Sequence, residues 1–206
     1  MIGLPSLEYQ HAFDLSAARI GREDGKKLVV ASNAFYAREA ITRLRGPQLI
    51  AQGWQLDDTF AGVHVTTLAD VEGPFNGIIW SEPLRDTAAD TLPKLLDLLA
   101  PGGALCVISS GALSRFLPPT HAENQVPLKW ANIQPILNAS SLKVERAMGF
   151  HGVVSIAWSY GFRLMNALNR LDLADRCLYK MRSVYAVPDG RACTLHTAIT
   201  VKGSPA

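Results

Sequence analysis

The sequence predicts an α/β fold built on a doubly wound, mostly parallel sheet, because three signals follow one another in one stretch of the chain. Residues 75–81 (FNGIIWS) are a short, nearly continuous apolar run bounded by turn residues, as expected of a strand covered on both faces. A leucine-rich helix should follow and end at Pro101-Gly102-Gly103. Residues 104–110 (ALCVISS) are the next apolar run. Strand, helix, turn and strand in this order make up half of such a sheet.

The helix between these strands is predicted to begin at Asp90, whose carboxylate can cap the first turn. Pro93 is tolerated there because the first amides of a helix have no partner within the helix. Apolar residues then recur along one face: Leu92, Leu95, Leu96 and Leu99.

Seven segments in all have the composition of strands. Residues 27–45 could also be a second strand with its helix, which would leave the fold without a first strand; the total of seven favours 27–32 as the first. The segments are 28–32 (LVVAS), 48–52 (QLIAQ), 63–68 (VHVTTL), 76–81 (NGIIWS), 104–110 (ALCVISS), 142–148 (LKVERAM) and 193–202 (CTLHTAITVK).

Three motifs in the same order resemble those of the class I S-adenosylmethionine-dependent methyltransferases that act on small molecules. Ala69-Asp70-Val71-Glu72 stands at the family's acidic turn, Phe75-Asn76-Gly77-Ile78-Ile79 at its FDxI strand, and residues 99–105 (LAPGGAL) at its LxPGGxL turn. The resemblance implies a three-layer, Rossmann-like methyltransferase fold. Its sheet would be seven-stranded and mostly parallel, with an antiparallel last strand beside the sixth.

The glycine-rich cofactor turn of that family is degenerate in this sequence. Glycine lets the backbone approach the cofactor closely, yet the first strand runs into Asn33-Ala34-Phe35-Tyr36 without one. We expect the side chains of Ala34, Phe35 and Tyr36 to occupy space that the cofactor fills in the family, unless the turn follows another path. The residues that the resemblance places near S-adenosylmethionine are Ala31, Asn33, Asp70, Val71 and Ser81.

Two sets of carboxylates have alternative roles. Asp70 matches the acidic turn near the adenine amino group in the family, or it stabilises its own short turn. Asp57 and Asp58 are candidates for the ribose-binding carboxylate, although solvated loop positions fit their spacing better.

Candidates for a catalytic role are few. Glu82 follows the fourth strand, a position that faces the substrate in such folds, and a desolvated carboxylate there could accept a proton. His121 is the titratable residue of the proline-rich segment, with a plain surface position as its alternative. His64 and His196 lie in strand patterns, where one face is expected to be exposed. The sequence contains no metal-site spacing and no nucleophile signature, so we expect no metal.

The organisation expected is a single methyltransferase-like domain over residues 1–206. Residues 1–26 should form a helical lead-in. Residues 111–140, with four prolines, should form a loop over the carboxyl edge of the sheet, where open α/β sheets bind ligands. Residues 158–183 should be helical with an apolar face packed on the sheet, and a homodimer face is the alternative.

Charge and cysteine content limit the classes of binding partner and the cellular location to be expected. A net charge of +2 with interspersed signs predicts neither nucleic-acid nor membrane binding, and no segment has the ~20 apolar residues of a membrane span. Three widely spaced cysteines (Cys106, Cys177, Cys193) argue against a disulfide scaffold and favour a cytoplasmic protein. We expect Cys106 to be an inert, buried residue of its strand.

Two functions remain open. The first is a methyltransferase-like protein in which cofactor binding is weakened or lost and which binds a small molecule or a protein partner. The second is an active S-adenosylmethionine-dependent methyltransferase with a divergent cofactor turn and a small-molecule substrate.

Overall fold

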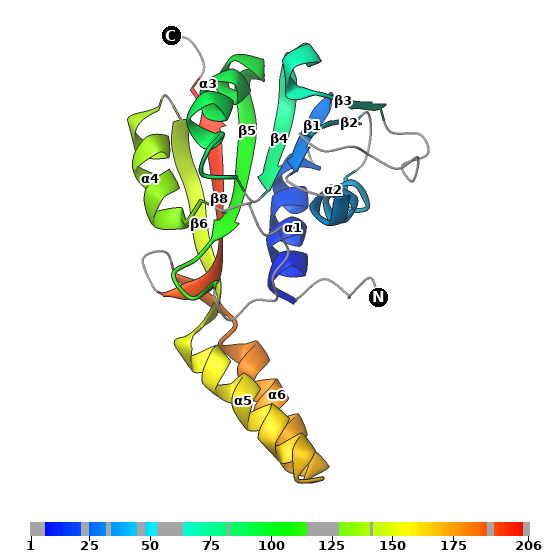
Figure 1. Ribbon diagram of the computed structural model, residues 1–206, viewed down its shortest axis with the longest axis vertical. Helices are drawn as coiled ribbons and strands as arrows, with labels where there is room; N and C mark the ends of the chain where they lie inside the picture. The colour runs from blue at the N-terminus through cyan, green and yellow to red at the C-terminus, as the bar shows by residue number, and fades with distance from the viewer. Residues whose placement is uncertain are drawn as a thin grey trace.

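The structure, a computed structural model, describes residues 7–21, 25–31, 34–44, 48–52, 64–81, 83–114, 128–140, 142–188 and 192–203. Its elements appear along the chain in Figure 1. They are α1 (Leu7–Ile20), β1 (Lys27–Ala31), α2 (Ala34–Ile41), β2 (Gln48–Gln52), β3 (His64–Thr66), the 3₁₀ helix η1 (Leu68–Asp70), β4 (Phe75–Ser81), α3 (Ala88–Leu98), β5 (Leu99–Ser110), α4 (Trp130–Ala139), β6 (Leu142–Gly152), α5 (Val153–Ala167), α6 (Leu171–Ser183), β7 (Ala186–Pro188) and β8 (Cys193–Lys202).

The strands form one sheet in the order β3-β2-β1-β4-β5-β8-β6-β7. The first five are parallel to their neighbours, whereas β8 lies antiparallel between β5 and β6. The expected fold class is therefore confirmed, including the antiparallel last strand beside the sixth. β1 lies inside the sheet, between β2 and β4, which confirms it as the first strand. All seven expected strands form, and the three-residue β7 adds an eighth at the edge of β6.

Helices cover both faces of the sheet and create three layers (Figure 1). On one face, α3 and α4 pack on a core that includes Leu95, Leu105 and Ile133. On the other face, α1 and α2 pack on a core that includes Phe13 and Ile108. The apolar runs of β1 and β4 are buried almost throughout because both faces are covered.

The expected loop over residues 111–140 is wrong for its final third. Residues 130–139 form α4, which buries Trp130, Ile133 and Leu137 at helical spacing and contains Pro135. Burial of this apolar face outweighs the loss of one helix hydrogen bond at proline, because each large apolar side chain contributes roughly 1.5–3 kcal/mol. Residues 115–127, with His121, lie outside the described ranges.

The expected position of residues 158–183 on the sheet is also wrong. The segment belongs to two helices, α5 and α6, that pack on each other and project away from the sheet (Figure 1). β6 runs in the direction of β5 and ends at Gly152, so the hairpin leaves from the carboxyl edge. None of the helices within the described ranges is long and apolar enough to span a bilayer.

Within the expected helical lead-in, the structure describes one helix, α1. The start of α3 differs in detail from expectation. α3 begins at Ala88 with Thr87 at its N-cap, so Asp90 lies within the first turn instead of capping it. A carboxylate in the first turn still interacts favourably with the helix dipole.

Cys106 is fully buried in β5, which confirms its expected packing role. Burial is the main cause that raises the pKa of its thiol to about 12.

We expect Cys106 and Cys193 to react with a thiol reagent at pH 8 only as the chain unfolds, whereas the partly exposed Cys177 reacts in the native state. In the unfolded chain the Cys106 thiol ionises from about pH 9, so its contribution to stability is present below that pH and is lost as the pH rises towards 12. Mass spectrometry after timed labelling checks this, and rapid native labelling of Cys106 would contradict it.

Candidate functional site

The carboxyl ends of the central strands lie side by side, and the side chains there are buried. Ala31 at the end of β1 is in register with Ser81 of β4 and Gln52 of β2, and Ser81 is in register with Ile108 of β5. Ala31, Ser81 and Ile108 are 4%, 1% and 0% exposed. The Ser81 hydroxyl donates a hydrogen bond to the carbonyl oxygen of Val30 at 3.4 Å. The structure therefore brings Ala31 and Ser81 together.

Asp70 ends the short helix η1, which follows β3. Its carboxylate accepts a hydrogen bond from Thr67 Oγ1 at 2.5 Å, and its backbone N–H donates to the Thr67 carbonyl oxygen at 3.1 Å. Asp70 itself is exposed, whereas the adjoining Val71 is buried in the core beneath α3. These contacts serve the turn, and they leave the outer part of the carboxylate open to solvent.

Tyr36, in the first turn of α2, packs towards α1 and the core rather than into open space at the strand ends. It is fully buried, its ring centroid is 4.9 Å from that of Tyr9, and its hydroxyl donates to the Tyr9 hydroxyl at 2.9 Å. The expectation that Tyr36 occupies space which the cofactor fills in the family stays a prediction. Only residues 32 and 33 connect β1 to α2, and the structure does not describe them.

A group of aromatic and imidazole rings lies at the carboxyl end of β6. His11 of α1 stacks on Phe150 at 6.1 Å and contacts Tyr185 at 5.4 Å, and Tyr185 also contacts His151 at 5.2 Å. His151 has a φ of +54°, donates its N–H to the Tyr185 carbonyl oxygen at 2.7 Å and bonds Ser155 Oγ through Nδ1 at 2.7 Å. These rings come from three distant segments, so the sequence pattern did not single them out.

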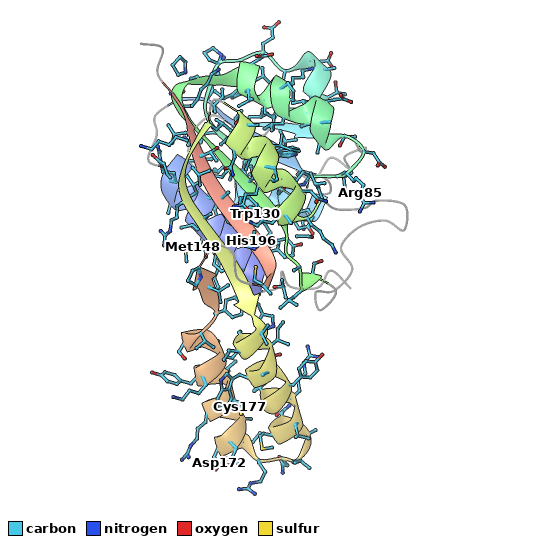
Figure 2. All side chains as sticks on the ribbon, turned by 90° about the vertical axis from the view of Figure 1, so that its left-hand side faces the viewer. Arg85, Trp130, Met148, Asp172, Cys177 and His196 are labelled. Atoms are coloured by element: carbon cyan, nitrogen blue, oxygen red, sulfur yellow. The ribbon has the colours of Figure 1, made fainter. Side chains whose placement is uncertain are left out.

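A third imidazole lies on the opposite face of the sheet. His196 of β8 is buried, and its ring stacks on Trp130 of α4 at 5.2 Å with an interplanar angle of 18° (Figure 2). The exposed face expected for His196 is therefore wrong. Ser109 of β5 is the residue directly opposite His196 in the ladder and is also buried. Nearby, Leu128 N–H donates to the Pro83 carbonyl oxygen at 2.7 Å, so the chain before α4 returns to the end of β4.

Comparisons with protein-family models and with curated proteins give no match. Solved structures of similar fold do exist. A phosphoethanolamine N-methyltransferase 2 from Haemonchus contortus superposes on 99% of this chain with a TM-score of 0.52 and 12% identity. The plantazolicin methyltransferase BpumL, solved with S-adenosylhomocysteine, matches 95% of this chain and 84% of its own length, with a TM-score of 0.54 and 9% identity. An S-adenosylmethionine-dependent methyltransferase from Mesorhizobium loti matches 93% and 98%, with a TM-score of 0.54 and 12% identity.

The fold is that of the class I S-adenosylmethionine-dependent methyltransferases. The chain spans about half the length, 55%, of the Haemonchus enzyme, and nearly the whole length of the Mesorhizobium one. At identities of 12% and below, the likeness concerns the methyltransferase fold alone.

Within this methyltransferase fold, three of the expected site residues lie outside the described ranges: Asn33, Glu82 and His121. Asp57 and Asp58 do as well, and the side chain of His64 is not described. Among the described residues, no group of three histidine, cysteine, aspartate or glutamate side chains could hold a metal ion. The expected set is thus represented by Ala31 and Ser81, which adjoin, and by Asp70 and Val71 in the turn after β3.

Proposed function

We propose that this protein is methyltransferase-like but binds S-adenosylmethionine weakly or not at all, and that it serves as a binding or scaffold subunit. The observation that carries the proposal is the glycine-free connection from β1 to α2, only two residues long. A short connection without glycine cannot easily bring backbone amides against a ligand, because side chains restrict both φ and close approach.

The burial at the strand ends supports the same proposal. The described side chains at the ends of β1 and β4 are the methyl group of Ala31 and the hydroxyl of Ser81, which Val30 already engages. β2 ends at Gln52, and the first acid after it is Asp57. The position that the family resemblance assigns to a ribose-binding carboxylate therefore has an amide. On these residues the cofactor fits poorly, and no reaction step is assigned to it here.

Calorimetric titration with S-adenosylmethionine and S-adenosylhomocysteine tests the proposal, with the Mesorhizobium loti enzyme as the positive control. We expect no saturable heat up to about 1 mM ligand. A dissociation constant above this concentration corresponds to a binding free energy smaller than ~4 kcal/mol. A thermal scan should then show no shift, since a ligand stabilises only in proportion to its binding.

Asp70→Ala is the diagnostic variant for this titration. If the parent chain binds, loss of binding in Asp70→Ala at unchanged stability would assign the carboxylate to the ligand. We expect instead that Asp70→Ala alters neither property by much, with less than about 1 kcal/mol lost in stability, because Asp70 is exposed and its bonds lie in its own turn. Saturable binding near 10 µM, about 7 kcal/mol, would overturn the proposal.

An active methyltransferase with a small-molecule substrate is the second candidate. The solved structures of similar fold favour it, since several were determined with S-adenosylmethionine or S-adenosylhomocysteine. His11, His151 and Tyr185 would then be groups available at the carboxyl edge to orient a substrate. Transfer of a labelled methyl group to any small molecule, lost on heat denaturation, would establish this function. In either case we propose a cytoplasmic location, with which three free thiols agree.

A further inference from the structure

The α5–α6 hairpin projects from the sheet, and hydrogen bonds join its two ends at the base. His151 and Tyr185 join its two ends by a backbone hydrogen bond of 2.7 Å, and His151 also bonds Ser155 in the first turn of α5. Along the hairpin, a Cβ added at Gly161 of α5 would lie 3.4 Å from Cys177 Sγ of α6, an ordinary contact distance, so the two helices face each other at these residues. Figure 2 shows Cys177 within the hairpin and Asp172 near its far end.

Most of the exposed apolar surface of the described residues lies on this hairpin. Ten large hydrophobic side chains are exposed in the described ranges, and eight of them belong to α5, α6 and the turn between them. A surface helix normally turns its apolar face to the core of its own chain, yet α5 projects away from the sheet. The eight are Val153, Val154, Trp158, Tyr160, Leu164, Leu168, Leu171 and Tyr179.

One stripe of α5, which we name the seam, has the spacing of a helix-pairing surface. Its residues follow one another at intervals of four, three, four and three, which is the repeat of a coiled-coil contact face. All of them are exposed, none is charged, and Arg163 is the single charged residue of the whole helix. The seam consists of Val153, Ala157, Tyr160, Leu164 and Ala167.

α6 does not cover the seam. Cys177 of α6 lies against Gly161 of α5, and Ala174, three residues earlier on the same side of α6, is buried. The outer surface of α6 has charged residues. α5 is therefore apolar around much of its circumference, and a helix of that kind is normally buried. Something other than the described residues of this chain should cover it.

The area and the pattern favour a second copy of this chain. The large side chains of the seam, with Leu168, Leu171 and the flanking Trp158 and Val154, are 38–61% exposed. Together they form an apolar surface of the order of the ~800 Å² that each partner of a standard interface buries. Small alanines on either side of the large tyrosine and leucine give the holes and knobs that a facing helix fills. A bilayer requires no such mixture of small and large side chains, and Asp172 near the tip would be costly to bring into lipid.

We propose that two copies of this protein dimerise by packing their seams together about a two-fold axis, as an antiparallel four-helix bundle of two hairpins. A two-fold interface uses the same patch on both chains, which a self-complementary uncharged stripe permits. The sheet is attached at the Val153 end of α5, so the antiparallel arrangement keeps the two sheets at opposite ends of the bundle. The proposal does not depend on whether a cofactor binds.

Light scattering after size exclusion, over a range of protein concentrations, tests the dimer with two matched variants. Tyr160→Glu places a carboxylate in the seam, whereas Tyr179→Glu makes the same change on the outer face of α6, at a side chain that is 72% exposed. We expect the parent chain and Tyr179→Glu to have twice the 22.3 kDa mass of one chain. Tyr160→Glu should raise the dimer dissociation constant at least about 100-fold, because burying an unpaired carboxylate at an apolar contact is unfavourable.

Since both tyrosines are exposed, circular dichroism and melting at low concentration should show that each variant folds like the parent. A parent chain that remains a monomer at 100 µM, about the concentration at which a weak interface assembles, would overturn the proposal. Equal weakening by both variants would also overturn it. A monomer that instead binds anionic vesicles, with Tyr160→Glu abolishing that binding, would assign the seam to a membrane surface and reject the second copy.

Discussion

Gly111→Ala is expected to lower the free energy of unfolding by about 3 kcal/mol, the upper part of the range for overpacked sites. Gly111 follows β5 and donates its N–H to the Thr194 carbonyl oxygen at 2.8 Å. A Cβ at this position would stand 2.2 Å from the carbonyl oxygen and 2.8 Å from the carbonyl carbon of Cys193. These are backbone atoms of β8, the strand between β5 and β6, so relief requires moving a central ladder.

Gly161→Ala is the control for the same substitution where space exists. Its Cβ would make an ordinary contact with Cys177 Sγ at 3.4 Å, and alanine is the better helix former by roughly 0.5–1 kcal/mol. We expect Gly161→Ala to keep or slightly raise stability. Urea unfolding followed by circular dichroism measures both variants. Equal midpoints for Gly111→Ala and the parent would mean that β8 is not held as closely as the structure has it.

Trp130→Ala should destabilise the chain by about 3–5 kcal/mol, as is typical when a buried large aromatic is truncated. Trp130 is 6% exposed, belongs to the core on the α3 and α4 face, and stacks on the buried ring of His196. The variant removes this stack and leaves a cavity between α4 and β8. It thereby tests whether the segment once expected as a loop is part of the core.

Two further variants are controls for Trp130→Ala. Trp130→Phe retains an aromatic ring against His196 and should cost less than about 1.5 kcal/mol. Ile136→Ala, on the same helix but 40% exposed, should cost less than about 1 kcal/mol. Chemical unfolding of all three variants is the measurement. A loss for Trp130→Ala as small as that for Ile136→Ala would show that α4 does not pack as described.

The strands were predictable because their signal is local. Burial on both faces demands a continuous apolar run, and residues such as Asn76 and Gly103 interrupt the chain near the ends of these runs. The segments 48–52 and 193–202 begin and end in the structure where the sequence places them. β7 was missed because three residues, Ala186–Pro188, are too few for an alternating pattern.

The helices exposed the limits of local reasoning. Prolines in 111–140 suggested a loop, yet Pro135 lies inside α4 because Trp130, Ile133 and Leu137 gain more by burial than the helix loses. The apolar face of 158–183 was assigned to the sheet because periodicity identifies a face and not its partner. The structure turns that face partly to α6 and partly outward.

Of the candidate site, Ala31 and Ser81 adjoin because the ends of neighbouring parallel strands meet at one edge, and their role at a cofactor stays a prediction. The sequence pattern missed the rings of His11, His151 and Tyr185, which meet only after α1, β6 and the end of the hairpin assemble. No spacing rule connects residues that tertiary folding alone brings together.

The position of β8 also governs how this chain can be made. β8 lies between β5 and β6, and Ala104 of β5 pairs with Val201 of β8. The β5–β8 ladder therefore cannot form until about a hundred further residues have been synthesised. During synthesis at roughly 5–20 residues per second, β5 would spend several seconds with an open, apolar edge. During that interval the open edge of β5 can pair with a wrong strand. Chaperones would therefore act on the nascent chain before β8 has been synthesised.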